Sequence, residues 1–250
     1  MKQLRSFPDE CSQDKGKENM SIKIDMQELL EAGAHFGHKT SRWHPKMAPY
    51  IHSKRREAHI INLEKTVEAL EEALPKVSAL AAQGKNILFV GTKKQAKDIV
   101  KETAESVGMP YVTVRWVGGT LTNVETVNKQ IKKLKDLERR MKSGELENRY
   151  SKLEVQRYQE EIDMLNERYG GIKEMNSRPA ALFVADAIVD KNAIKEANSL
   201  GIPVFAIADT NVDPSNIDYV IPANDDAIKA TSLILGYFAE AIKEGQAKKQ

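Results

Sequence analysis

The chain has 250 residues, of which 41% are hydrophobic, and its formal net charge is only +2 at pH 7. It is long enough to bury a sizeable core, and any nucleic-acid surface must be confined to a patch rather than cover the whole protein. The only cysteine, Cys11, excludes an intramolecular disulfide framework, and no apolar run approaches the ~20 residues that span a bilayer. We therefore expect a cytoplasmic protein without a membrane segment.

Residues 1–20 form a polar segment without periodicity, in which four basic residues balance four acidic ones. Such a composition offers too little apolar surface for folding, so we predict a disordered leader. Met20 directly precedes the first patterned segment, and translation therefore starts at either Met1 or Met20. Mass spectrometry of the native protein would decide, because a peptide containing Cys11 requires the longer form.

Residues 35–59 are the most cationic part of the chain. They hold all five histidines and six lysines or arginines, against a single acid, Glu57. Aromatic rings lie among these charges, which suits an anionic partner with flat bases, that is, a nucleic acid. Composition alone supports equally a solvated basic loop whose aromatic residues reach the core. The residues concerned are Lys39, Arg42, Lys46, Lys54, Arg55 and Arg56, with Phe36, Trp43, His44 and Tyr50.

Helices are predicted at 25–33 and 64–82, on either side of this basic segment. We expect the second helix to bend or restart at Pro75, because a proline inside a helix costs ~3 kcal/mol. Residues 58–62 can add a short strand before it.

Five short apolar runs follow, and helical periodicity fills most of the intervals between them. Continuous apolar character is typical of strands covered on both faces, and alternating strands and helices predict a parallel sheet. The predicted fold class is therefore α/β, with a doubly wound parallel sheet of about five strands. A capping box at Thr92 and Gln95 should start a helix to about 107, Asp190 should cap the next, and a last helix spans 225–243. The predicted strands are 87–91, 111–115, 180–185, 203–208 and 219–221.

One connection is far longer than a crossover needs, since more than sixty residues separate the second and third predicted strands. Within it, capping boxes that begin at Thr122 and Ser151 each precede apolar residues spaced three and four apart. Two such runs joined by a turn predict an antiparallel coiled-coil hairpin with arms of roughly 30 Å. Residues 129–142 hold seven lysines or arginines against two acids, whereas 152–168 hold three against five.

Two turns between a strand and a helix are candidate phosphate sites. In RWVGGTLTN at 115–123, the glycine pair lets the backbone approach a ligand, and the free N–H groups at the helix start can hold a phosphate. A glycine turn with an ordinary cap explains the same letters and is favoured without further context. In VGTKKQ at 90–95, two lysines oppose the dipole of the predicted helix, so an anion should compensate them. The candidates are Lys93, Lys94, Arg115, Gly118, Gly119, Thr120 and Asn123.

Signatures of common nucleotide-binding and hydrolytic enzymes are absent, since the sequence contains neither GxGxxG, nor GxSxG, nor GxxxxGK followed by Ser or Thr. Asp186 and Asp209 end predicted strands and suit a magnesium site, but capping of the next turn is favoured. His35 and His38 can ligate a metal with one of these aspartates, although polar anchoring of a loop is favoured. We therefore predict neither a cofactor nor a metal.

Six stretches are informative together: LLEAGAHFGHKTSRWHPKMAPYI, IINLEKTVEAL, ILFVGTKKQA, RWVGGTLTN, LGIPVFAIADTNVDP and YVIPANDDAIKA. From about Met26 to Gly245 they resemble the family of bacterial small-subunit ribosomal protein two. The resemblance implies a flavodoxin-like sheet domain with a coiled-coil hairpin, docked on the outer face of the small subunit between head and body. It also implies late assembly onto the rRNA, recruitment of ribosomal protein one, which is the large mRNA-binding protein, and no catalytic step.

The sequence departs from the family pattern in three places. Val124 follows Asn123 where an aromatic residue is common, the chain ends EGQAKKQ in place of the acidic tail of some relatives, and the leader has no counterpart. The expected domains are a leader at 1–20, an α/β sheet domain at 21–121 and 172–245, a hairpin insertion at 122–171 and a tail at 246–250.

The leading hypothesis is a structural, non-enzymatic protein that contacts small-subunit rRNA, ribosomal protein one and neighbouring proteins. Its cations should converge into one continuous surface for folded RNA. The alternative is a nucleotide- or cofactor-binding enzyme that uses the crevice near Gly91 and Gly118, while a protein-docking role of the hairpin is compatible with RNA binding. The predicted RNA contacts include the cations of the basic segment with Trp43 and His44, and the candidate residues of the two turns. On the hairpin, the predicted RNA contacts are Lys129, Lys132, Lys133, Arg139 and Arg140.

Overall fold

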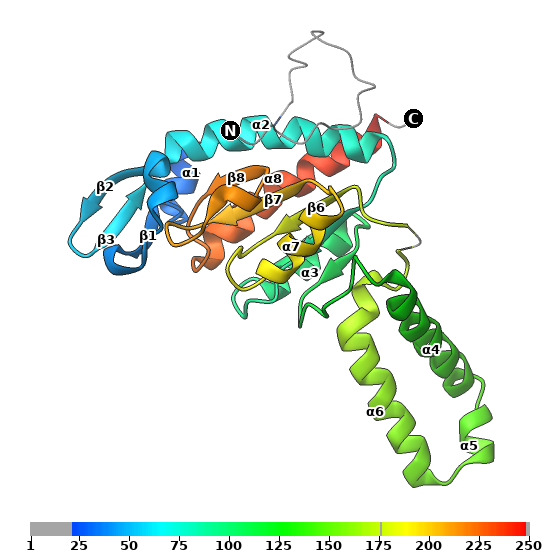
Figure 1. Cartoon of the computed structure of the whole chain (residues 1–250). Coiled ribbons are helices and arrows are strands. Elements are labelled where there is room, and N and C mark those ends of the chain that lie inside the picture. Colours follow the sequence, from blue (N-terminus) through cyan, green and yellow to red (C-terminus); the bar gives the residue numbers. More distant parts are fainter. Residues whose placement is uncertain (1–21, 176, 249–250) are drawn as a thin grey trace.

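The structure, a computed structural model, describes residues 22–175 and 177–248, and the predicted leader lies outside them. Its centre is a five-stranded sheet in which every neighbouring pair is parallel (Figure 1). The strand order is β5-β4-β6-β7-β8, so the first strand of the sheet lies second from one edge, as in flavodoxin. The strands are β4 (Ile87–Val90), β5 (Tyr111–Val112), β6 (Ala181–Val184), β7 (Val204–Ala208) and β8 (Tyr219–Pro222).

Apolar side chains cover both faces of this sheet, which explains why its strands have continuous apolar character. In β4, Ile87 and Phe89 join one core cluster, while Leu88 and Val90 join the other. The first cluster is completed by α1 (Met26–Glu31), α2 (Leu63–Ala82), α3 (Lys97–Ser106) and α8 (Ile228–Ala247). The second is completed by α7 (Lys191–Ser199) and by the inserted helices described below.

The prediction that the second helix bends or restarts at Pro75 is wrong, because α2 is one helix from Leu63 to Ala82. Pro75 has no N–H group, so the carbonyl of Glu71 loses its hydrogen bond within the helix. Both residues lie on the exposed face of α2, where water can bond that carbonyl. The other face packs against α8 so closely that a Cβ on Gly245 would clash with the carbonyl oxygen of Ser78. This packing holds the helix together across the proline.

The basic segment is not the loop that the sequence suggested. It forms a second, antiparallel sheet of order β1-β3-β2, built from β1 (Phe36–Lys39), β2 (Ile51–Arg55) and β3 (Ala58–Ile61). Two 3-10 helices, η1 (Thr40–Arg42) and η2 (Pro45–Tyr50), connect β1 to β2. We call this unit the small sheet. Figure 1 shows that it projects from one end of the five-stranded sheet.

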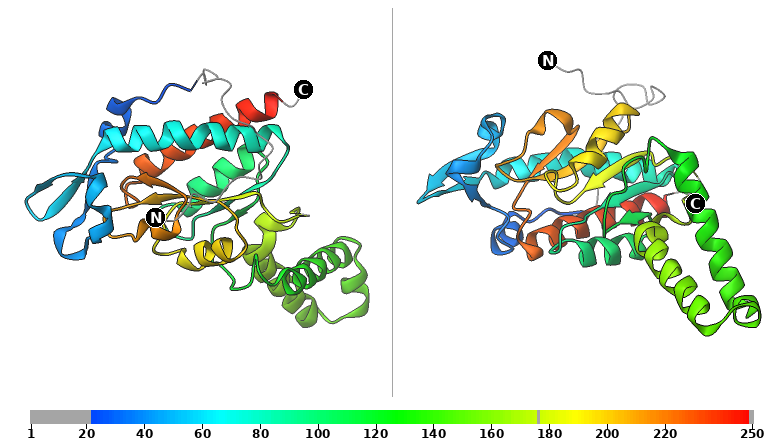
Figure 2. Two further views of the ribbon diagram at one scale, coloured as in Figure 1. Left: turned by 45° about the horizontal axis from the view of Figure 1, so that its top comes forward. Right: turned by 60° about the horizontal axis from the view of Figure 1, so that its bottom comes forward.

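Three helices form an arm between β5 and β6. They are α4 (Val124–Lys142), a short α5 (Glu145–Arg149) at the tip and α6 (Lys152–Tyr169), and α4 and α6 run side by side away from the sheet (Figures 1 and 2). The capping box of Ser151 is present, but α4 is capped by Asn123 rather than Thr122. The predicted apolar seam is buried at Val127, Ile131, Leu134, Leu137, Ile162, Leu165 and Tyr169.

Candidate nucleic-acid interface and the carboxyl edge of the sheet

The tip of the β2–β3 hairpin carries three adjacent cations. Lys54, Arg55 and Arg56 are exposed, and the described part of the chain offers none of them an ion-pair partner. Arg56 begins the two-residue turn and has a φ of 56°, in the left-handed region that favours glycine. An arginine is therefore held at a strained backbone position in the exposed turn of this hairpin.

The cations near η1 and η2 differ from one another. Lys39 and Arg42 are exposed and, within the described residues, unpaired. Lys46 is also exposed, but its ammonium lies 3.2 Å from Asp213 Oδ1 and 2.6 Å from the hydroxyl of Ser215. Hydrogen bonds from Ser215 and then Lys46 hold the pKa of Asp213 at about 2, so that this carboxylate is charged at neutral pH.

Two rings of the basic segment serve partly structural purposes. The Nδ1 atom of His44 accepts the backbone N–H of Lys46 and caps η2, while its Nε2 lies 4.0 Å from Asp213. Trp43 is 39% exposed, and its ring centre lies 5.2 Å from that of His59. Trp43 can therefore present one side to a partner while the other side rests on the protein.

The basic side of α4 is partly neutralised inside the arm. Lys133 pairs with Glu161 of α6, Arg139 lies 2.5 Å from Asp136, and Arg140 lies 3.4 Å from Glu145. Of the predicted contacts on α4, Lys129 and Lys132 are exposed and have no ion-pair partner in the described ranges. The arm therefore offers fewer free charges than its composition suggests.

The turn at 115–123 does bind an anion, but the anion is Glu196 of α7. Its carboxylate accepts the backbone N–H groups of Gly119 at 2.8 Å and Leu121 at 3.0 Å. The indole N–H of Trp116 donates at 3.0 Å, and Thr122 donates both its N–H and its hydroxyl at 3.3 Å. The predicted phosphate contact is thereby corrected to an internal one, since a phosphate would have to displace this carboxylate.

The remaining candidates of this turn are also largely engaged. Thr120 is buried and its hydroxyl donates to the carbonyl of Val117 at 2.6 Å. Asn123 accepts the N–H of Thr126 and so caps α4. Gly118 and Arg115 are exposed, and Arg115 is the cation of this turn that remains available to a partner.

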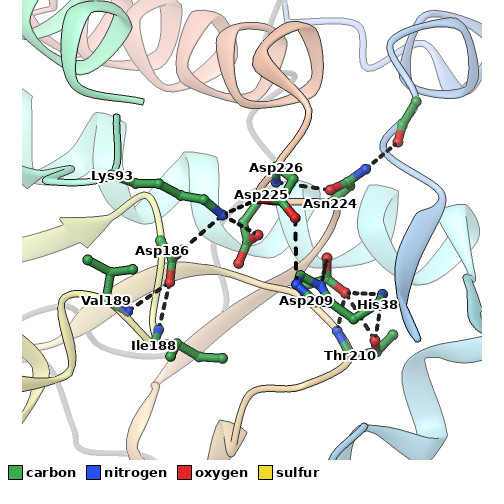
Figure 3. Close-up of polar contacts among 11 residues, drawn as sticks. His38, Lys93, Asp186, Ile188, Val189, Asp209, Thr210, Asn224, Asp225 and Asp226 are labelled. Carbon is green, nitrogen blue, oxygen red and sulfur yellow. Dashed lines mark hydrogen bonds and ion pairs between the residues drawn. The ribbon is translucent and has the colours of Figure 1, made fainter. Parts of the chain in front are cut away.

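Lys93 is likewise engaged by the protein (Figure 3). Its ammonium lies 2.7 Å from Asp225, 2.7 Å from Asp226 and 3.0 Å from Asp186. Burial alone would lower the pKa of Lys93, but the hydrogen bonds to Asp225 and Asp226 outweigh it and raise the pKa. The anion expected beside this lysine is therefore supplied by three carboxylates of the chain, whereas Lys94 is exposed and unpaired within residues 22–175 and 177–248.

These charged groups meet because four parallel strands end at one edge of the sheet. Lys93 follows β4, Asp186 follows β6, Asp209 follows β7, and the pair Asp225–Asp226 follows β8. Burial, and then the charge of Asp186, raise the pKa of Asp225 to about 6. We call Lys93, His38 and the four aspartates the edge cluster. Sequence reasoning missed Asp225 and Asp226, although their position directly after a predicted strand was a usable signal.

Two expected helix caps near the edge cluster are wrong for one reason. Asp190 does not cap α7 with its side chain but accepts the hydroxyl of Thr92 at 2.7 Å and its N–H at 3.1 Å. Thr92 is therefore unavailable for its predicted capping box, and α3 begins only at Lys97. Asp186, by contrast, accepts the N–H groups of Ile188 and Val189, as expected of an acid that caps the turn after a strand.

The histidines also separate. His38 joins the edge cluster, with its Nδ1 2.8 Å from Asp209 Oδ2. His35 stays outside it, and among the described residues its Nδ1 atom has no hydrogen-bond partner. Within the described part of the chain, the one group whose ligand atoms lie close enough for a metal is His38, Asp225 and Asp226.

That the cations form one continuous surface stays a prediction. The small sheet and the arm lie at opposite ends of the five-stranded sheet, and both figures of the whole chain show this separation (Figures 1 and 2). The unpaired cations of the two protruding parts therefore form two separate regions, while Lys94 and Arg115 lie on the sheet domain. The β2–β3 hairpin belongs to one and the start of α4 to the other.

The alternative site for a nucleotide or cofactor gains no support. A Cβ on Gly91 would lie 2.6 Å from a methyl carbon of Val100, so α3 packs directly against this glycine. A hollow of about 420 Å³ lies elsewhere, beside Lys46 and Tyr50. The predicted crevice near Gly91 and Gly118 is thus filled by packing and by the Glu196 carboxylate.

These features define a class of protein: an α/β scaffold with a small basic sheet at one end and an inserted helical arm at the other. A sequence model of the family described as Ribosomal protein S2 matches residues 29–245. The chain is 50% identical over 225 residues to the small ribosomal subunit protein uS2 of Porphyromonas gingivalis, in strains ATCC 33277 and W83, covering 89% of this chain and 79% of each relative. The chain therefore belongs to the ribosomal protein S2 family.

This membership confirms the resemblance found in the sequence and, with it, a place in the small subunit of the cytoplasmic ribosome. The family is one of structural ribosomal proteins. Among the helices of the described residues, none is long and apolar enough to cross a bilayer.

The carboxylate of Glu196 generates a stability prediction. Burial opposes its ionisation, but the hydrogen bonds from Trp116 and the backbone of the turn outweigh burial and lower the pKa of Glu196. Glu196→Gln should reduce the free energy of unfolding by about 2–3 kcal/mol near neutral pH, because donors lose a charged acceptor. Because folding lowers the pKa, this deficit should be constant above the ordinary value of 4.5 and shrink as the pH falls below it.

Urea unfolding followed by circular dichroism measures both effects. Glu102→Gln on the exposed side of α3 is the matched control and should stay within about 0.5 kcal/mol of the wild type. An equal loss in both variants, or a deficit that grows in acid, would contradict the role assigned to Glu196.

Proposed function

We propose that this chain binds small-subunit rRNA through phosphate and shape contacts and has no catalytic step of its own. The observation that supports this most directly is a set of exposed cations without ion-pair partners in the described ranges. Uncompensated cations repel one another, and phosphates relieve that repulsion with the release of counterions. Among the predicted RNA contacts, the set comprises Lys39, Arg42, Lys54, Arg55 and Arg56 on the small sheet, Lys94 and Arg115 on the sheet domain, and Lys129 and Lys132 on α4.

Two contact regions at opposite ends suit a large folded RNA better than a short single strand. Each region would meet its own part of the backbone, and the distance between them would be set by the sheet domain. Phosphate contacts of this kind fix position and carry little base specificity. The cations that already form ion pairs contribute less to RNA binding, because their charge is compensated within the protein. These cations are Lys46, Lys93, Lys133, Arg139 and Arg140.

Charge reversal at the hairpin tip tests the proposal. Arg55→Glu combined with Arg56→Glu should weaken rRNA binding and impair incorporation into small subunits while leaving the fold intact. The slope of log K against log salt should flatten by about 0.7–0.9 for each phosphate that the variant no longer neutralises. Filter binding to small-subunit rRNA over a salt series and sedimentation of subunits measure the two effects.

The matched control reverses two exposed lysines on the sheet domain, Lys97→Glu with Lys101→Glu, which changes the net charge equally. It should bind almost as the wild type does. An identical loss in both double variants would mean that overall charge, rather than the small sheet, governs binding. A nearly flat salt dependence of the wild type would count against phosphate contacts altogether.

Arg56 offers a test in which stability and binding move in opposite directions. A left-handed φ costs a non-glycine residue about 1–3 kcal/mol, of which glycine recovers part after its own entropic cost. Arg56→Gly should therefore leave the free energy of unfolding unchanged or raise it by about 1 kcal/mol, yet weaken rRNA binding. Arg55→Gly is the control, because Arg55 lies in the strand and glycine there should cost about 0.5–1 kcal/mol. If Arg56→Gly binds rRNA like the wild type, the strained arginine is no RNA contact.

We also propose that the chain helps to dock ribosomal protein one for mRNA recruitment, as the family resemblance implies, and that the arm carries this contact. The support is on α6, whose charge is net acidic and which exposes two large apolar side chains, Leu153 at 62% and Met164 at 49%. Eleven residues separate them, close to three helical turns, so they lie on one face of α6. Such a face suits a protein neighbour, while α4 carries the free cations.

The double variant Leu153→Ser with Met164→Ser should reduce the amount of ribosomal protein one retained on purified small subunits, with rRNA binding unchanged. Ile188→Ser with Val189→Ser is the matched control, since these exposed apolar residues lie on the sheet domain. Quantitative mass spectrometry of washed subunits measures the retention. Full retention in the α6 variant would remove this face from the docking surface.

A further inference from the structure

The edge cluster contains a histidine whose second nitrogen faces two carboxylates. Nε2 of His38 lies 3.6 Å from Asp226 Oδ2, and ligand atoms of His38, Asp225 and Asp226 all lie within 4.8 Å of one another (Figure 3). Asp225 is buried, whereas the side chain of Asp226 is 54% exposed. The group is thus closed on one side and open to solvent on the other.

Asp209 fixes the orientation of the histidine. It is fully buried, and its Oδ1 accepts the N–H groups of His38 and Thr210. Its Oδ2 has no hydrogen-bond partner in the described part of the chain and lies 2.8 Å from Nδ1 of His38. A proton on Nδ1 satisfies this buried oxygen, so that in the neutral imidazole Nε2 is the nitrogen left for a metal, on the side of Asp225 and Asp226. Metal-binding histidines are commonly held in this way by a carboxylate on the other nitrogen.

The single ammonium group of Lys93 does not neutralise the carboxylates of both Asp225 and Asp226. It contacts Oδ1 of Asp225 and Oδ1 of Asp226, so the second oxygen of each carboxylate remains for another cation. Three aspartates, Asp186, Asp225 and Asp226, surround this one ammonium group. A further cation would reduce their mutual repulsion in a site where burial makes that repulsion strong.

We propose that His38 Nε2 and the carboxylates of Asp225 and Asp226 bind one divalent ion of the Zn²⁺ type. One imidazole and two carboxylates supply three ligands, and the open side admits water as a fourth. The imidazole favours Zn²⁺ over Mg²⁺, which prefers carboxylate, carbonyl and water oxygens. His35, Asp186 and Asp209 are not ligands in this assignment. The ion would tie β1 of the small sheet to the loop between β8 and α8.

Isothermal titration of the chelator-treated full chain with Zn²⁺ tests the site, with thermal unfolding as a second readout. We expect saturable binding of one ion per chain and a higher Tm, and no comparable effect of Mg²⁺. His38→Gln and Asp226→Asn should each abolish both effects, and Asp226 is exposed enough for its variant to fold. Asp209→Asn should weaken binding about 10–100-fold, because it orients the histidine without touching the ion.

His52→Gln is the matched control, since His52 is exposed on β2 outside the cluster, and it should bind Zn²⁺ as the wild type does. Three outcomes would overturn the proposal. They are the absence of saturable binding by the wild type, undiminished binding by both His38→Gln and Asp226→Asn, and an effect of Mg²⁺ equal to that of Zn²⁺.

Discussion

The ammonium group of Lys93 connects the ends of three strands of the parallel sheet. It follows β4 and contacts Asp186 after β6 and the Asp225–Asp226 pair after β8. Removing charges from water costs several kcal/mol per ion, and the cost is offset only where opposite charges meet in good geometry. The edge cluster meets that condition for Lys93, which explains how Asp186, Asp225 and Asp226 can gather at one sheet edge.

Glu196 shows the same principle at the base of the arm. A glycine turn followed by a helix start collects N–H groups that favour an anion, and the protein fills that place with its own carboxylate. A residue pattern can thus identify an anion-binding turn without revealing whose anion occupies it. Glu196 lies more than seventy residues from the glycine pair, and no local spacing links the two.

The sequence predicted the five-stranded parallel sheet well because burial on both faces leaves a direct mark, namely continuous apolar runs such as 87–91 and 203–208. It predicted the helices of the arm for a similar reason, since the apolar residues at three and four spacing are those that pack between α4 and α6. The small sheet left a weaker mark. Only Ile61 of its strands is buried, so β1 and β2 lack the apolar pattern by which a strand is recognised.

The candidate RNA contacts were predicted by residue type but not by availability. Whether a lysine is free depends on acids far away in sequence, as Lys46 with Asp213 and Lys133 with Glu161 illustrate. The caps failed for the same reason, because Asp190 is engaged by Thr92 across the sheet edge rather than by its own helix. Composition counts charges, whereas the fold decides which of them remain for a partner.

The two protruding parts of the molecule are both joined to the sheet domain through buried or half-buried carboxylates. Asp209 holds His38 of the small sheet, and Glu196 holds the turn from which α4 departs. These contacts fix the direction of the β2–β3 hairpin and of the arm, and hence the spacing between the two cationic regions. A fixed spacing favours RNA binding, because a protein whose contact regions are already in position loses less conformational entropy on association. The carboxylate of Glu196, which occupies the anion site of the glycine turn, is therefore also the contact that holds the base of the arm and the cations of α4 in place.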